Sequence, residues 1–176
     1  GKELDAELKS YATFINNATG RGNLGKFEES APLLNALFFS PRYVVSRFNL
    51  LSPTTYAKMS PSARKEALKT VGAFIGVGLT TLALAKAGGA EAEEDPRSSD
   101  FGKIKTGNVR YDIWAGFTQV VRLLANIITG QKKNYKKEIE TLGEGYKSDT
   151  RGDILQRFGR SKLSPAAGMA ADFLEG

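Results

Sequence analysis

The sequence contains no cysteine and no histidine among its 176 residues. Without cysteine the chain can form no disulfide bond and carries no thiol nucleophile. Histidine is the usual general acid or base near neutral pH, and His and Cys are the usual zinc ligands. Any catalysis would depend on Asp, Glu, Lys, Ser or Tyr, so the sequence favours a non-enzymatic protein with no cofactor and no metal.

Neither sign of charge dominates, but the small excess of positive charge is unevenly distributed. The net charge is +6; residues 1–100 carry 12 basic and 11 acidic groups, and residues 101–176 carry 13 and 8. Such a bias suits contact with phosphates or anionic lipid headgroups, and it is also common on ordinary protein surfaces. Hydrophobic residues make up 41% of the chain, which is enough for a folded protein.

The chain begins at Gly1 without an initiator methionine or a cleavable signal pattern, so we expect a fragment of a longer protein or a processed chain. Its length fits a single helical module over residues 1–176. An alternative is a subdivision into residues 1–90 and 100–176, joined by an acidic linker.

Apolar residues at helical spacing predict a first helix over residues 2–17, ended by a polar run. Glycines then indicate a flexible loop, and helical character resumes over residues 26–37, with Pro32 as a point of division. Four serine–proline pairs predict further helix starts, because serine can cap a helix and proline suits its first position. Pro41, Pro61 and Pro165 would each begin a helix, and Pro53 would open a short turn or helix before Met59.

The helix that begins at Pro61 changes character along its length, because residues 70–85 carry no charge. This segment spans ~24 Å as a helix, which is short of the ~30 Å hydrocarbon core of a bilayer. We therefore expect a buried bundle helix, and the alternative is a membrane-active segment with Lys86 at a headgroup. Gly72 and Gly76 have the spacing that lets two helix backbones approach closely.

The strongest amphipathic pattern predicts a helix from Asn108 to Gly130. Asn108 would cap the helix, Asp112 would complement its positive end, and Gly130 would take the left-handed position that ends it. Its apolar residues would form one wide stripe, which we call the Trp114 stripe. The stripe consists of Val109, Ile113, Trp114, Phe117, Val120, Val121, Leu124, Ile127 and Ile128.

The remaining segments are polar connectors and two short helices. We expect a linker or extended segment over residues 97–107, a polar stretch to residue 149, a helix near residues 153–158 and a last helix over residues 165–174. No segment alternates with period two for long enough to predict a sheet. The predicted fold is all-α: an irregular multi-helix bundle with a long central apolar helix and extended polar connectors.

Residues 20–25 match the GxGxxG pattern of dinucleotide-binding sites. In such sites a strand precedes the glycines and an acidic residue follows about twenty positions later. Here a helical pattern precedes them, and Val44 and Val45 stand where the acid belongs. We therefore expect a mobile connector at this place. Nearby, Arg42 and Arg47 flank an aromatic-rich helix, and we expect packing there rather than a stacking platform for bases.

Two charged clusters remain. Glu91, Glu93, Glu94 and Asp95 could hold Ca²⁺ or Mg²⁺ through oxygen ligands, but they lack the spacing of a calcium loop, so we expect a solvated linker.

Lys132, Lys133, Lys136 and Lys137 could contact phosphates of nucleic acid or lipid headgroups, with Tyr135 stacking on a base. Lysines after a helix end are also favoured by the helix dipole alone.

Three stretches together resemble a known family. They are residues 17–22 leading to residues 36–42, residues 97–105 with residues 111–116, and residues 157–165. They resemble one of the domains associated with the large polyvalent proteins of bacteriophages and related mobile elements, and the resemblance covers residues 17–175 in order. It implies a place near the end of a very long phage protein that enters the host with the DNA. No catalytic residue is carried over.

From these observations we expect a non-enzymatic packing module of a virion protein, internal or associated with the portal or tail. It would meet other virion proteins or copies of itself through the Trp114 stripe and the face of Gly72 and Gly76. The alternatives are a membrane-active segment that helps the genome cross the host envelope and a packaging module that contacts nucleic acid. We expect no small-molecule substrate.

Overall fold

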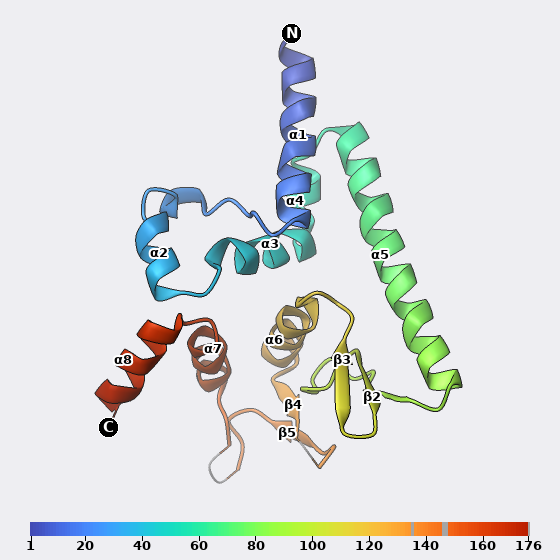
Figure 1. Cartoon of the computed structure of the whole chain (residues 1–176), viewed down its shortest axis with the longest axis vertical. Helices are drawn as coiled ribbons and strands as arrows, with labels where there is room; N and C mark the ends of the chain where they lie inside the picture. The colour runs from blue at the N-terminus through green and yellow to red at the C-terminus, as the bar shows by residue number, and fades with distance from the viewer. Residues whose placement is uncertain (135, 146–147, 176) are drawn as a thin grey trace. The chain divides into compact units, whose positions relative to one another are not determined.

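A computed structural model describes residues 1–134, 136–145 and 148–175 of the chain. The protein is mostly helical (60%), with eight α-helices in the described residues (Figure 1). The α-helices are α1 (Lys2–Ala18), α2 (Ala31–Leu37), α3 (Pro41–Leu51), α4 (Pro53–Ala57), α5 (Pro61–Ala87), α6 (Phe117–Thr129), α7 (Arg151–Arg160) and α8 (Pro165–Glu175). A short 3₁₀ helix, η1 (Gly25–Phe27), precedes α2.

Within the described residues, five short strands form two small antiparallel sheets, so the prediction of an all-α fold was wrong in this respect. The first sheet has the order β1-β2-β3 and the second pairs β4 with β5. The strands are β1 (Glu91–Ala92), β2 (Lys103–Thr106), β3 (Val109–Asp112), β4 (Gln131–Lys133) and β5 (Ile139–Thr141).

The described chain divides into two compact units. Unit 1 consists of Gly1–Gly72 and Gly159–Gly176, and unit 2 consists of Ala73–Phe158. Helix α5 begins in unit 1 and ends in unit 2. Each unit has a small core of its own and is described by itself.

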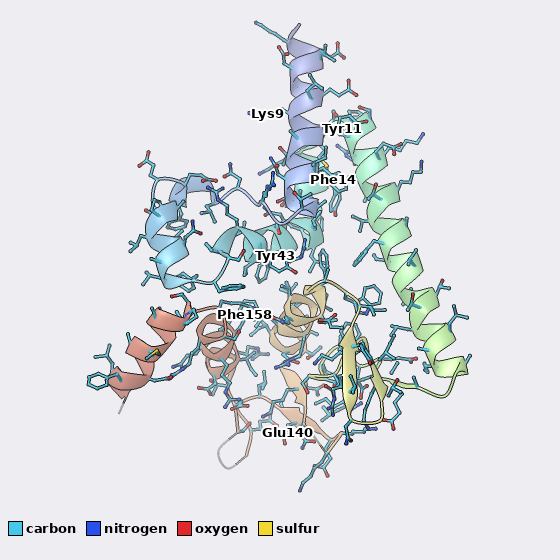
Figure 2. All side chains as sticks on the ribbon, in the orientation of Figure 1. Lys9, Tyr11, Phe14, Tyr43, Glu140 and Phe158 are labelled. Carbon is cyan, nitrogen blue, oxygen red and sulfur yellow. The ribbon has the colours of Figure 1, made fainter. Side chains whose placement is uncertain are left out.

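In unit 1, α1 packs against α3 through a junction that is partly polar (Figure 1). Phe14 of α1 is 8% exposed, and Asn17 at the end of the same helix is buried. Asn17 Oδ1 accepts a hydrogen bond from Asn49 Nδ2 at 3.1 Å. The buried guanidinium of Arg47 lies 4.2 Å from the ring centroid of Tyr43, and Figure 2 labels Tyr43 on α3. The arginine therefore serves the packing of this junction, as expected.

The helices predicted at Pro41, Pro61 and Pro165 are confirmed, because α3, α5 and α8 begin at these prolines. At Pro53, where a turn or a helix was expected, the structure has the short helix α4. Serine caps two of these helices: Ser60 Oγ accepts from the Ala63 amide at 3.4 Å, and Ser164 Oγ accepts from the Ala167 amide at 3.3 Å. The chain before α8 is joined to the end of α2, since the Ser164 amide donates to Leu37 O at 2.8 Å.

In unit 2, the helix predicted from Asn108 was wrong over its first nine positions. Residues 109–112 form β3, which pairs with β2 across the two-residue turn of Gly107 and Asn108. Ala115 and Gly116 have φ values of 48° and 79°, and these left-handed conformations delay the start of α6 to Phe117. Gly130 ends α6 with φ 66°, which confirms the predicted stop.

Asp112 holds this corner of unit 2 together, although it does not lie in a helix. Its Oδ1 accepts from the Trp114 amide at 2.9 Å, and its Oδ2 accepts from the Thr118 hydroxyl at 3.1 Å. The carboxylate thus links the end of β3 to the first turn of α6, where the positive end of the helix dipole favours it.

Candidate functional site

Helix α5 is the feature of the chain that most needs a functional explanation. It has 27 residues, and among the described residues it is the helix long and apolar enough to cross a membrane by length and composition. Its most apolar 18-residue window has a mean hydropathy of 1.6, and 11% of that window is buried. The expectation that this helix is buried in a bundle of the same chain was therefore wrong.

One side of α5 packs against the rest of the chain. Ala63 and Ala67 have no exposed surface, and Arg64 donates to the carbonyl oxygens of Tyr56 and Met59 at 2.9 and 3.1 Å. These contacts fix the corner between α4 and α5, because the guanidinium satisfies carbonyls that the short helix leaves free.

Further along the same side of α5, Gly78 receives the indole of Trp114. A Cβ at position 78 would lie closer than 3.0 Å to the ring carbons Cη2 and Cζ3 of Trp114. The ring of Phe74, one turn earlier, meets the Trp114 ring edge-on at 5.8 Å between centroids. Trp114 Nε1 also donates to Gly102 O at 3.0 Å. The indole therefore connects three parts of unit 2: α5, the residue that precedes β2, and the start of α6.

The opposite side of α5, which we call the outer face, is open. Residues advance by 100° in a helix, so Lys65, Lys69, Gly72, Gly76 and Ala83 share this side, and all five are exposed. Nothing lies within 4 Å of a Cβ built on Gly72 or Gly76. Large apolar side chains border the outer face on its two edges. They are Leu68 (52% exposed), Ile75 (45%), Leu79 (56%), Val77 (68%) and Leu84 (68%).

The few polar groups in the uncharged part of α5 are largely satisfied within the helix. The hydroxyls of Thr80 and Thr81 each donate to the carbonyl oxygen four residues earlier, both at 2.8 Å. A hydroxyl bonded in this way does not require water. The uncharged segment can therefore be covered by an apolar partner without leaving these two donors unpaired.

Only part of the Trp114 stripe is exposed to solvent. Trp114 and Phe117 are half-buried within unit 2, and the ring of Phe117 lies 5.7 Å from that of Phe74. Val121 is half-buried, and Leu124 is 37% exposed. One member of the stripe, Val120, is buried, together with Thr118, Leu123 and Asn126 of the same helix. That the exposed end of the stripe meets a partner stays a prediction.

The two lysines of β4 are held by carboxylates of unit 2. Lys132 Nζ lies 2.6 Å from Asp149 Oδ2 and 3.0 Å from Glu140 Oε2, and Figure 2 shows Glu140 on β5. Lys133 Nζ lies 2.9 Å from both carboxylate oxygens of Glu93. A phosphate would have to displace these partners, so both lysines are less available than the sequence indicated.

These ion pairs also set the protonation of the carboxylates. The hydrogen bond from Lys132 holds the pKa of Asp149 below its usual value, with a further contribution from Arg157, which bonds both oxygens. The same contact raises the pKa of Lys132. The cluster is a structural ion-pair network, and each charged form stabilises the other.

The last two lysines of the predicted phosphate contact lie after β4. Lys136 and Lys137 are exposed, and Lys137 has φ 66°. The predicted stacking residue Tyr135 lies outside the described residues. Contact of this segment with phosphates stays a prediction.

The acidic cluster is part of unit 2 rather than a solvated linker. Glu91 and Glu94 pair with Lys105 and Lys86, respectively, at the surface. Glu93 is paired with Lys133, as described above, and its side chain is 19% exposed.

Asp95 is the most strongly held member of the cluster. Two hydrogen bonds from the Arg97 guanidinium, at 2.9 and 2.8 Å, lower the pKa of Asp95 to about 2. In the part of the chain that the structure describes, no three acidic side chains group in a way that could hold a metal ion.

The glycines of residues 20–25 serve packing. Helix α1 precedes them, and the Gly22 amide donates to Arg42 O of α3 at 3.2 Å. A Cβ on Gly22 would lie 2.7 Å from the Ser46 amide nitrogen, so only glycine allows the loop to approach α3 this closely. The loop is therefore packed against α3 within unit 1, and the expectation of a mobile connector was wrong.

Gly78 was not predicted to matter from the sequence. Its only signal was a third glycine in the uncharged segment, and without the position of Trp114 it cannot be distinguished from Gly72 and Gly76.

Comparison with known proteins adds no identification. No protein-family model, no curated protein and no solved structure matches this chain.

Proposed function

We propose that this chain is a non-enzymatic assembly module of a bacteriophage virion protein, and that it joins copies of itself or other virion proteins through the outer face of α5. The observation that carries this proposal is that 11% of the most apolar 18-residue window of α5 is buried. Soluble proteins rarely leave a continuous apolar surface of this size in water, and such surfaces usually mark interaction sites.

Burial of the exposed apolar side chains of α5 would stabilise an assembly. Leu68, Ile75, Val77, Leu79 and Leu84 are each between 45% and 68% exposed. Complete burial of one such side chain stabilises by ~1.5–3 kcal/mol, so covering the exposed parts of five yields on the order of 5 kcal/mol. A partner that covers the outer face gains this free energy without changing the fold of the chain.

The phage context rests on the resemblance of residues 17–22, 36–42, 97–105, 111–116 and 157–165 to a domain of large polyvalent phage proteins. In that context the module would lie inside the particle, or at its portal or tail, and would leave with the genome.

The test is sedimentation velocity of the chain over a range of concentrations. We expect association that weakens when Val77 and Leu84 are both replaced by Glu, because the charges would have to be buried. Leu155→Glu is the matched control, since Leu155 is 52% exposed on α7 and lies off the outer face. A chain that stays monomeric at every concentration would contradict the proposal.

A second candidate function is favoured by the length and hydropathy of α5: a membrane-active segment that helps the genome cross the host envelope. Lys69 and Lys86 bracket the uncharged segment and could reach headgroups on the two sides of a bilayer. Flotation with liposomes tests this candidate. Binding that requires anionic lipid and is abolished by Gly76→Asp would favour it, and no binding to either anionic or neutral liposomes would count against it.

We do not extend the proposal to nucleic acid. The ammonium groups of Lys132 and Lys133 are held by carboxylates of the same chain, and no described feature favours phosphate contact over these partners.

A further inference from the structure

We propose that the contact of Trp114 with Gly78 and Phe74, which we call the Trp114 latch, is autoinhibitory: α5 enters a bilayer only after this contact opens. This inference rests on the second candidate function, the membrane-active segment, and adds the contact that controls it. It is carried by the position of the indole along α5 and by the charged groups that the fold fixes beside the indole.

The Trp114 latch lies within one compact unit. All three of its residues belong to unit 2. Of residues 73–87, all of which the structure describes, only Gly78 is buried. Unit 2 therefore holds its part of α5 mainly at one place, where the indole lies on Gly78 and the ring of Phe74 meets the indole edge-on.

The latch lies at the middle of the segment that a bilayer would cover. In the uncharged residues 70–85, Gly78 is near the midpoint, ~12 Å from either end of the segment. If this segment crossed a bilayer with the latch closed, the indole would lie near the centre of the hydrocarbon core. Other parts of unit 2 would enter with it, because Trp114 Nε1 donates to Gly102 O at 3.0 Å.

Charged groups next to the indole oppose that arrangement. Asp112 Oδ1 accepts from the Trp114 amide at 2.9 Å, so a carboxylate lies beside the same residue. Lys103 directly follows Gly102, and its Nζ lies 3.5 Å from Asp100 Oδ1. Charged side chains near the centre of a bilayer are costly. A closed latch and a membrane-spanning α5 are therefore mutually exclusive states of the chain.

Few other contacts oppose the release of α5 from unit 2. Gly88 and Gly89 connect α5 to β1, and without side chains their backbone is freer than that of other residues. The ion pair of Lys86 with Glu94 lies at the surface, with side chains 46% and 74% exposed, so it contributes little to holding the helix. The indole contact is therefore the main barrier to release.

Two substitutions of glycine by alanine test the latch, because they change the hydropathy of α5 equally. Gly78→Ala forces the indole out of its place, whereas the methyl group of Gly76→Ala meets nothing within 4 Å. We expect Gly78→Ala to raise partitioning into vesicles of anionic phospholipid by about fivefold or more, because it raises the population of the open form. Gly76→Ala should leave partitioning nearly unchanged. Flotation measures the bound fraction of each variant.

Asp149→Ala is the control for a general loss of stability. It removes a carboxylate that holds Lys132 and Arg157 in unit 2, and it leaves the residues of the Trp114 latch in place. We expect vesicle binding to stay nearly unchanged in this variant, although unit 2 loses stability.

The fluorescence of the single tryptophan reports the latch in the bound state. After release, the indole stays on unit 2 through its bond to Gly102 O while α5 enters the lipid. On vesicle binding we therefore expect acrylamide in the water to quench Trp114 more strongly, and phospholipids brominated in their acyl chains to quench it little. Entry of α5 with the latch closed would give the reverse of both changes.

Each contrary outcome is recognisable. Equal vesicle binding by Gly78→Ala and Gly76→Ala, or an equally large rise in Asp149→Ala, would overturn the latch, and the membrane-active function survives both results. Strong quenching of bound protein by the brominated acyl chains would also overturn it. If Gly78→Ala exposes the indole to acrylamide and still binds no vesicle, the latch and the membrane-active function fail together.

Discussion

Position 78 of α5 has a glycine whose missing side chain leaves room for the indole of Trp114. Gly72 and Gly76 lie on the other side of the same helix, where a side chain would meet nothing within 4 Å. The three glycines are alike in sequence context and differ in what surrounds them. Substitution by alanine therefore separates their roles.

Gly78→Ala should destabilise the protein by about 1–3 kcal/mol, because the added methyl group forces Trp114 out of its place. Gly76→Ala is the matched control and should stabilise the protein by up to about 1 kcal/mol, since alanine favours helix and the space is open. Urea unfolding of dilute protein, followed by the fluorescence of the single tryptophan, measures both effects. Equal stability of the two variants would show that the indole does not pack on Gly78.

A second prediction at this scale concerns Asp149, which holds Lys132 and Arg157 and has a side chain that is 11% exposed. Asp149→Ala should destabilise unit 2 by about 1–3 kcal/mol, because a partly buried ammonium loses its closest partner. Asp172 pairs with Arg160 but is 70% exposed, so Asp172→Ala should change the free energy of unfolding by less than about 1 kcal/mol. Chemical unfolding compares the two; a larger loss at Asp172 would contradict this view of the cluster.

The helical elements could largely be predicted from the sequence. Proline at positions 41, 53, 61 and 165 fixes the backbone near helical φ and needs no hydrogen-bond donor there, and α3, α4, α5 and α8 begin at these residues. Proline at the first helical position predicts where a helix begins because the first turn depends on only a few neighbouring residues.

The first sheet could not be predicted in the same way. Its strands β2 and β3 have four residues each, too few for an alternating pattern to stand out from helical spacing. Val109 and Ile113 also fit the apolar stripe of a helix, which led to the wrong start at Asn108. The available signal was the pair Gly107 and Asn108, which is typical of a two-residue hairpin turn.

The hairpin leads to a prediction for the element as a whole. Gly107 has φ 59° and no neighbouring atom within 4 Å of a built Cβ, so any cost of substitution there comes from the backbone. Gly107→Ala should destabilise the β2–β3 hairpin by about 1 kcal/mol. Asn108→Ala, at the adjacent position of the same turn, should have a smaller effect. Amide hydrogen exchange of residues 103–112 reports both; equal exchange in the two variants would contradict the prediction.

For the candidate site, the sequence predicted the glycines of α5 but not the exposure of its outer face. Gly72 and Gly76 were identified from their spacing, and the structure places them on an exposed face. Burial of α5 was expected because apolar helices usually lie inside the fold. Which side of α5 the chain covers depends on Trp114, 36 positions after Gly78 in the sequence, and no local pattern carries that information.

At the scale of the whole molecule, the ion pairs predict how stability depends on pH. The pKa of Asp95 is lowered to about 2, and the pKa values of Glu93 and Asp149 are also lowered. Carboxylates with lowered pKa values stabilise the fold while they are ionised. Their contribution is complete above pH ~4–5 and is lost as the pH falls towards ~2.

With no histidine in the chain, the free energy of unfolding should change little between pH ~5.5 and ~8 and should fall steeply below pH ~4. Urea unfolding at a series of pH values measures this profile. A steep loss of stability centred near pH 6 would contradict it.

The whole account depends on the outer face of α5 being covered when the protein is at work, and the reactivity of a thiol there tests this directly. In Val77→Cys, whose native side chain is 68% exposed, maleimide labelling should slow as the protein concentration rises, while labelling of Glu29→Cys on unit 1 should not change. That is the predicted result. A labelling rate at position 77 that stays the same at every concentration and with vesicles present would show that the outer face stays in water and would contradict the account.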